Sequence, residues 1–227
     1  MVLPDYWMQR PQFFLDEDTR LAFEGLVNRI LSGGGNDLIK YELPVPRWQF
    51  LCYLADTQPV VLHGTGNPDI SEFEPRQSND LQDFGNQTAV YAAGDGIWAM
   101  FFAIVDRNHF SMSVTNASIR LVDSAGFISE PYYVFSVSKS ALVHQPWRTG
   151  YIYIMPDDTF VTQPEFPFGD YQVRVPQLAS MVPVTPLGRL EVMPEDFPFL
   201  AQIRGHEDER LQEYAAALQT GSTWPED

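Results

Sequence analysis

Five strand-like segments follow one another in the second half of this chain, and no helical pattern separates them. They are rich in Tyr, Val and Ile, which favour pleated strands, and Gly, Asp or Pro punctuates them. The segments cover residues 110–122, 132–138, 150–156, 170–175 and 188–194. A doubly wound parallel sheet would need a helix between successive strands, so this order predicts an α+β fold.

Helical patterns lie mostly before these strands. Residues 16–31 place Leu21, Leu26 and Ile30 near helical spacing, and the acidic residues at the start suit the positive end of a helix dipole. Further helices are predicted over 46–56, 94–107 and 206–218, and buried strands over 59–65 and 88–93. The stretch SGGGND at 32–37 follows a helix and lacks the Lys-Ser/Thr of a phosphate loop, so we interpret it as a linker.

The order of these elements suggests three parts of the chain. We expect an N-terminal helical segment over 1–57, a core domain over 58–200, and a C-terminal helix and tail over 201–227. Of the 227 residues, 44% are hydrophobic, which is ample for a packed core.

The charge balance bears on which partners to expect. The formal net charge is −16 at pH 7, from 30 acidic and 14 basic residues, so binding to a phosphate backbone is disfavoured. The N-terminal sequence lacks the basic region and apolar core of a signal peptide, and no apolar run approaches a membrane span. We therefore expect a cytoplasmic protein with no membrane partner and no general affinity for nucleic acid.

Several familiar chemistries find no support in the sequence. A Gly-x-Ser-x-Gly elbow is missing, and the histidines are scattered without paired spacing, which argues against a metal site. The histidines are His63, His109, His144 and His206. Cys52 stands alone in an apolar, helix-like context, and we expect it to be a small buried side chain.

Two short motifs are the main indication of function in this sequence. The predicted strand at 59–65 ends in His63-Gly64-Thr65, and FGNQTAVYAAGDGIWAMFFA follows over 84–103. In this order and spacing they resemble the ADP-ribosyltransferase superfamily of poly(ADP-ribose) polymerases and diphtheria toxin. That family has His-Gly-Ser/Thr on one strand, then Phe-Gly, a Tyr and a helix with an aromatic residue. The resemblance covers roughly residues 60–194 and implies a split β-sheet core, with NAD as the substrate.

The resemblance implies a role for each matching residue. His63 would hydrogen-bond the adenosine ribose of NAD, and the backbone of Gly64 would hold the nicotinamide carboxamide. Thr65 would stand for the small hydroxyl residue of the family. Tyr91 would stack on the nicotinamide ring, with Phe101 or Phe102 as the second aromatic wall. Physically, aromatic faces suit a flat cationic ring, and a glycine lets a ligand approach the backbone closely.

The sequence departs from the family at its third element. Gln177 falls where a catalytic glutamate is expected, and a glutamine carries no charge to stabilise the cation that develops on the ribose. The acceptor could supply the carboxylate instead, as is supposed for mono-ADP-ribosyltransferases that lack the glutamate. Otherwise Glu165 or Glu191 would enter the site. Glu165 lies in a Pro- and Phe-rich loop, where a solvent-facing position is expected.

Two arginines are candidates for the NAD pyrophosphate, because a guanidinium fork suits phosphate oxygens. Arg76 ranks first, since it follows the His63 strand, and Arg107 ranks second. Surface ion pairs with Glu74 or Asp106 are the alternative for both.

Three functions remain open from the sequence. The leading one is an NAD-binding mono-ADP-ribosyltransferase or NAD glycohydrolase in which His63, Tyr91 and Gln177 act, with an acceptor left open and a protein among the candidates. The second is a catalytically inactive domain that binds NAD, ADP-ribose or a protein. The third is an interaction domain in which the motifs are accidental.

Overall fold

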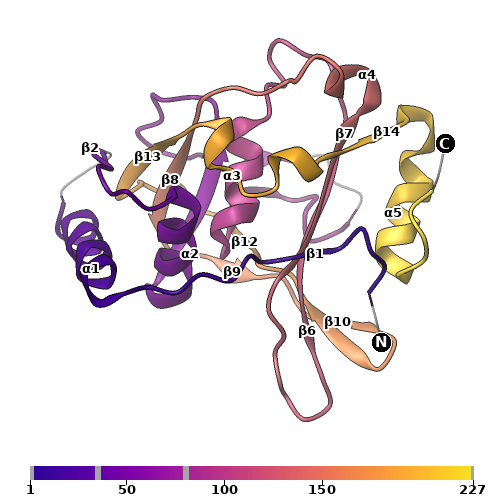
Figure 1. The fold of residues 1–227 in the computed structure, drawn as a ribbon, viewed down its shortest axis with the longest axis horizontal. Helices are drawn as coiled ribbons and strands as arrows, with labels where there is room; N and C mark the ends of the chain where they lie inside the picture. The colour runs from indigo at the N-terminus through magenta and orange to yellow at the C-terminus, as the bar shows by residue number, and fades with distance from the viewer. Residues whose placement is uncertain (1–2, 34–36, 79–81, 226–227) are drawn as a thin grey trace.

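The computed structural model describes residues 3–33, 37–78 and 82–225. Its helices and two sheets form a mixed architecture (Figure 1), and the predicted α+β class is confirmed. The helices are α1 (Glu17–Ser32), α2 (Arg47–Thr57), α3 (Gly96–Ile104), α4 (Lys139–Leu142) and α5 (Leu211–Thr220), with 3-10 turns at Pro194–Asp196, Leu200–Gln202 and Asp208–Arg210. The strands are β1 (Met8–Gln9), β2 (Asp37–Leu38), β3 (Val60–Thr65), β4 (Arg76–Gln77), β5 (Thr88–Ala93), β6 (Val114–Val122), β7 (Tyr132–Ser138), β8 (Gly150–Pro156), β9 (Val161–Thr162), β10 (Phe166–Phe168), β11 (Tyr171–Arg174), β12 (Gln177–Ser180), β13 (Gly188–Val192) and β14 (Arg204–His206).

The first sheet has the strand order β2-β13-β8-β3-β5-β12-β9. Strand β3 pairs with β8 along its whole length, whereas it meets β5 at a single pair, Leu62↔Ala93. At its other end β5 pairs with β4 through Ala89↔Arg76. The sheet therefore opens between β3 and β5 just beyond Leu62.

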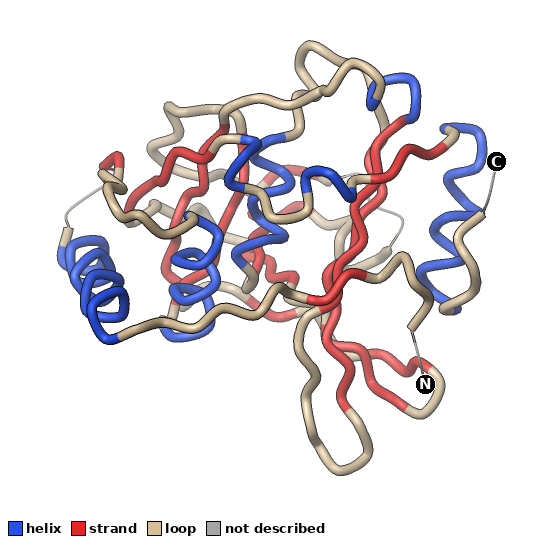
Figure 2. The backbone as a smooth tube through the Cα atoms, in the orientation of Figure 1, coloured by secondary structure: helices blue, strands red, loops and turns tan. Residues whose placement is uncertain are grey.

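The second sheet has the order β1-β7-β6-β11-β10, and β14 pairs with β7 in parallel. Its long strands β6 and β7 lie on the far side of α3 from β8 and β13 (Figures 1 and 2). The N-terminal segment meets α5 beside this sheet: the Tyr6 hydroxyl donates to the carbonyl oxygen of Ala217 at 3.1 Å, and the Tyr6 ring lies 5.3 Å from that of Trp224, which follows the helix.

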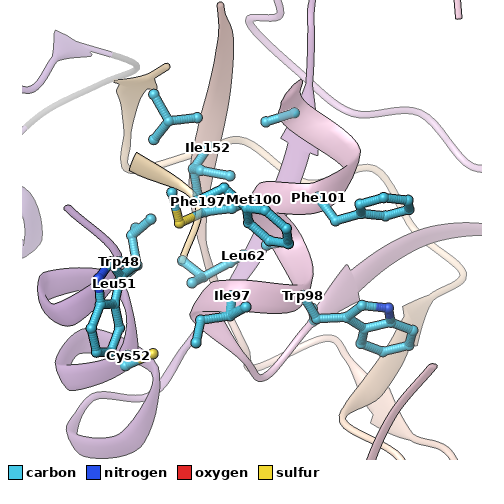
Figure 3. Packing of buried hydrophobic residues seen from close by; sticks show 14 of the residues in the cluster. Trp48, Leu51, Cys52, Leu62, Ile97, Trp98, Met100, Phe101, Ile152 and Phe197 are labelled. Carbon is cyan, nitrogen blue, oxygen red and sulfur yellow. The ribbon is translucent and has the colours of Figure 1, made fainter. Parts of the chain in front are cut away.

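Helix α3 is the centre of the main hydrophobic core. Ile97, Met100 and Phe101 are fully buried, and the core continues into α1, α2, β3, β7 and β8. In Figure 3, Ile97 lies near Leu51 and Cys52 of α2, and Trp98 projects from the other side of α3. Cys52 is fully buried, as predicted. The first 57 residues thus share a core with the rest of the chain and include two short strands, β1 and β2, besides their helices.

Most predicted elements occur within a few residues of their expected positions. The C-terminal helix is an exception: it begins at Leu211, because residues 204–206 extend along β7 as β14. In the predicted linker over 32–37, Ser32 is the last residue of α1, Gly33 follows it and Asp37 begins β2; the remaining three residues lie outside the described ranges. Across the described ranges, no helix is both long and apolar enough to cross a bilayer.

Candidate functional site

A cavity of about 200 Å³ lies where β5 separates from β3, against α3. Its walls bring together residues from three strands and one helix. They include His63, Gly64, Tyr91, Trp98, Phe102 and Gln177, together with Leu62 and three alanines. Residues from each of the two sequence motifs therefore meet Gln177 at one site, although 114 positions separate His63 from Gln177.

His63 spans the opening between the two strands. Its Nδ1 lies 2.7 Å from the carbonyl oxygen of Tyr91, and its ring packs on Phe73 at a centroid distance of 4.8 Å. A carbonyl can only accept, so Nδ1 carries the hydrogen and the neutral ring leaves Nε2 as an acceptor. Burial lowers the pKa of His63, which favours this neutral form.

Tyr91 is fixed by the loop that precedes it. Its hydroxyl donates to the carbonyl oxygen of Phe84 at 2.9 Å and accepts from the backbone N–H of Gln87 at 2.8 Å. The Phe-Gly turn upstream of the tyrosine therefore holds the phenol end of the side chain, while the ring lines the cavity.

Gly64 has a packing reason to be glycine that the sequence did not predict. A Cβ there would lie 1.9 Å from the carbonyl oxygen of Ala99, so the missing side chain lets α3 pack directly on β3. Gly150 on β8 has the same role, since a Cβ there would lie 2.1 Å from the carbonyl oxygen of Ala103. Residues two apart in a strand turn their amide groups to the same side. Since Leu62 pairs with Ala93, the N–H and C=O of Gly64 point toward the opening, where β5 no longer pairs with β3.

The aromatic wall is Phe102 and not Phe101. Phe102 lines the cavity and is 37% exposed, whereas Phe101 is fully buried against Phe135 at a centroid distance of 4.8 Å. A second ring of the wall, Trp98, was missed from the sequence. Its Nε1 donates to Oδ1 of Asn116 on β6 at 2.6 Å, and its ring lies 6.1 Å from that of Phe102. The i, i+4 spacing of these two rings is the signal that could have paired them.

Gln177 reaches the site from β12. It pairs with Ala93 and so shares a sheet face with it. The alternative carboxylates lie elsewhere: Glu165 pairs with Arg174 at 2.7 Å, and Glu191 accepts from the Tyr151 hydroxyl at 3.1 Å. Among the described residues, the cavity is lined by no carboxylate.

Thr65, Arg76 and Arg107 do not line the cavity. Thr65 follows Gly64, so it faces away from α3, and its Oγ1 accepts from the N–H of Asn67 at 3.2 Å. Arg76 is exposed on β4, and Arg107 is exposed beyond α3. The structure therefore does not bring the two predicted phosphate contacts to the cavity.

A buried polar cluster holds the start of α3. Asp95 is 2% exposed and caps the helix, because its Oδ1 accepts from the N–H of Trp98 at 2.8 Å. Its Oδ2 accepts from Arg10 at 3.0 Å and from the Tyr133 hydroxyl at 2.7 Å. Burial raises the pKa of Tyr133, which keeps this hydroxyl a donor. The N-terminal segment thus helps to position the helix that carries Trp98 and Phe102.

Fold and site together define an α+β protein with an aromatic-walled cavity at an opening in its first sheet. Comparison of the chain with protein-family models, with curated proteins and with solved structures finds no match. We therefore infer the function from the geometry of the cavity.

Proposed function

We propose that this chain has an ADP-ribosyltransferase-like fold and binds NAD at the opening between β3 and β5. The observation that supports this most is the convergence of His63, Gly64, Tyr91 and Gln177 on one cavity. Nε2 of His63 can accept from a ribose hydroxyl, and the backbone of Gly64 can pair with a carboxamide. Tyr91, Trp98 and Phe102 offer aromatic surface for the nicotinamide ring.

The cavity is smaller than the 300–1,000 Å³ that is typical for drug-sized ligands. It suits the nicotinamide end of NAD, with the remainder of the dinucleotide lying along the outside. We propose that the reaction is cleavage of the nicotinamide–ribose bond, with transfer of one ADP-ribose to an acceptor or to water. A carboxylate from the acceptor would supply the charge that Gln177 lacks.

A second candidate is an inactive domain that binds NAD or ADP-ribose. The neutral side chain of Gln177 favours it, because losing a group that stabilises transition-state charge typically costs about 10²–10³ in rate. In this case the ligand would bind without release of nicotinamide.

Release of free nicotinamide from NAD tests the enzymatic proposal. We expect slow release by the wild type over hours, loss of release in His63→Ala, and unchanged release in the control His144→Ala, whose histidine is exposed. Release that persists unchanged in His63→Ala would contradict the assigned site.

A variant that adds a negative charge in the cavity distinguishes the enzyme from the inactive binding domain. Gln177→Glu restores the carboxylate inside the cavity, and Gln172→Glu adds the same charge at an exposed position of β11. Faster release in Gln177→Glu alone would indicate a site that is competent but weakened. No release by the wild type or by Gln177→Glu, with NAD still bound, would favour the inactive domain.

A further inference from the structure

Three aromatic side chains line one small cavity. Tyr91 comes from β5, and Trp98 and Phe102 come from successive turns of α3. Two of the rings are held at their polar ends: Trp98 by Asn116 at 2.6 Å and Tyr91 by Phe84 at 2.9 Å. The rings are therefore fixed before any ligand arrives, and little ordering is needed on binding.

The remaining lining is electrically neutral. Gln177 is uncharged, and His63 donates its one ring hydrogen to the carbonyl oxygen of Tyr91. Among the described residues, no Lys or Arg side chain lines the cavity to repel a cation. The whole chain carries a formal charge of −16, so its field also favours cations over anions.

Neutral aromatic walls around a small cavity are the usual means by which proteins bind an organic cation, since ring faces carry negative potential. We propose that this cavity selects a positively charged N-alkylpyridinium ring over a neutral ring of the same shape, and that Trp98 is the residue that determines this selectivity. Trp98 has this role because an indole face attracts cations more strongly than a phenol or phenyl face.

This inference rests on the proposed function in one respect, the identity of the ring. The nicotinamide ring of NAD is cationic. When the bond to the ribose breaks, its electron pair goes to the ring nitrogen, so the ring becomes neutral and the positive charge develops on the ribose carbon. A cavity that prefers the cation would hold oxidised NAD and release neutral nicotinamide. It would also discriminate against reduced NAD, whose ring is neutral.

The test compares 1-methylnicotinamide, a cation, with neutral nicotinamide. Calorimetric titration of the full chain should show tighter binding of the cation, by about 3- to 30-fold for a cation–π contribution of ordinary size. Trp98→Leu should reduce this ratio to near one, and Trp98→Phe should leave an intermediate ratio. The matched control is Trp147→Leu, because Trp147 lies outside the cavity and its loss should leave the ratio unchanged.

A titration at high salt distinguishes the contribution of the aromatic rings from that of the net charge of the chain. At about 0.5 M salt, charges on the distant surface are largely screened, whereas contacts inside the cavity are not. The preference for the cation should therefore persist. Equal affinity for the two ligands, a preference lost at high salt, or a preference that Trp98→Leu leaves intact would each overturn the proposal. If Trp98→Leu does not fold, Phe102→Leu replaces it, because Phe102 is partly exposed, and a smaller fall in the ratio is expected.

The same preparations are assayed for nicotinamide release from NAD. A preference for the cation without release would support the selective cavity and count against the enzymatic proposal. Release of nicotinamide without a preference for the cation would support the enzymatic proposal and count against the selective cavity.

Discussion

Nδ1 of His63 lies 2.7 Å from the carbonyl oxygen of Tyr91, across the opening between β3 and β5. The two strands pair directly only at Leu62↔Ala93, so this side-chain bond takes the place of the next backbone pair. It joins the two sequence motifs physically.

The His63 bond should contribute to stability as well as to binding. His63→Ala leaves the carbonyl of Tyr91 without this donor, and losing a partly buried hydrogen bond of this kind costs about 0.5–1.5 kcal/mol. We expect a loss of this size in the free energy of unfolding measured with urea. His144→Ala, at an exposed position, should change it by about 0.5 kcal/mol or less. Equal effects of the two variants would contradict the role assigned to His63.

Gly64 should tolerate no side chain. In Gly64→Ala the new methyl group would lie 1.9 Å from the carbonyl oxygen of Ala99, and such overpacking costs about 1–3 kcal/mol or more. The control is Gly25→Ala in α1, where nothing lies within 4 Å of the added carbon. That change should stabilise the chain by about 0.5–1 kcal/mol, because alanine favours a helix. Thermal unfolding of both variants checks the contrast in sign.

Asp95 should matter far more than an ordinary helix cap. Asp95→Ala removes the cap of α3 and also leaves Arg10 without one of its buried partners; breaking a buried ion pair costs about 3–5 kcal/mol. Asp16→Ala removes only the exposed cap of α1, whose Oδ1 accepts from the N–H of Thr19, and should cost about 1 kcal/mol. Comparable losses in chemical unfolding would show that the Arg10 contact contributes little.

The half-buried His63 and the buried His206 should make the fold sensitive to mild acid. Burial lowers the pKa of both His63 and His206, the latter against the opposing charges of Asp208 and Glu207. Below about pH 6.5 the unfolded chain therefore takes up protons that the folded chain refuses. Stability should fall from pH 7 to pH 5, by at most about 1.4 kcal/mol per pH unit for each histidine. Replacing both by glutamine should flatten this slope in urea unfolding; a slope that stays the same would contradict the assignment.

The sequence predicts which residues meet at the cavity better than it predicts how their side chains are arranged there. His63, Gly64, Tyr91 and Gln177 are found at one cavity because the β3 and β5 motifs are local patterns that strand pairing brings together. The choice between Phe101 and Phe102 depends on the register of α3. Asp95 caps that helix, and one of its buried partners, Arg10, lies 85 positions away. No local pattern contains that contact.

Long-range contacts also explain the other differences between the sequence-based predictions and the structure. Gly64 matched a ligand-binding motif, yet its missing side chain is required by α3, a helix that begins 32 residues later. Strand β14 was missed because it forms only by pairing with β7, about 68 residues earlier in the chain. Both features depend on tertiary contacts, and local sequence propensity does not contain them.

Calorimetric titration with NAD shows whether the cavity between β3 and β5 binds a dinucleotide. If the opening between β3 and β5 is a dinucleotide site, the folded wild type should bind NAD saturably at millimolar concentration or below. Removing the His63 side chain should weaken that binding, and the Gly25→Ala control should bind as the wild type does. No measurable binding by folded wild-type protein at millimolar NAD would contradict the account.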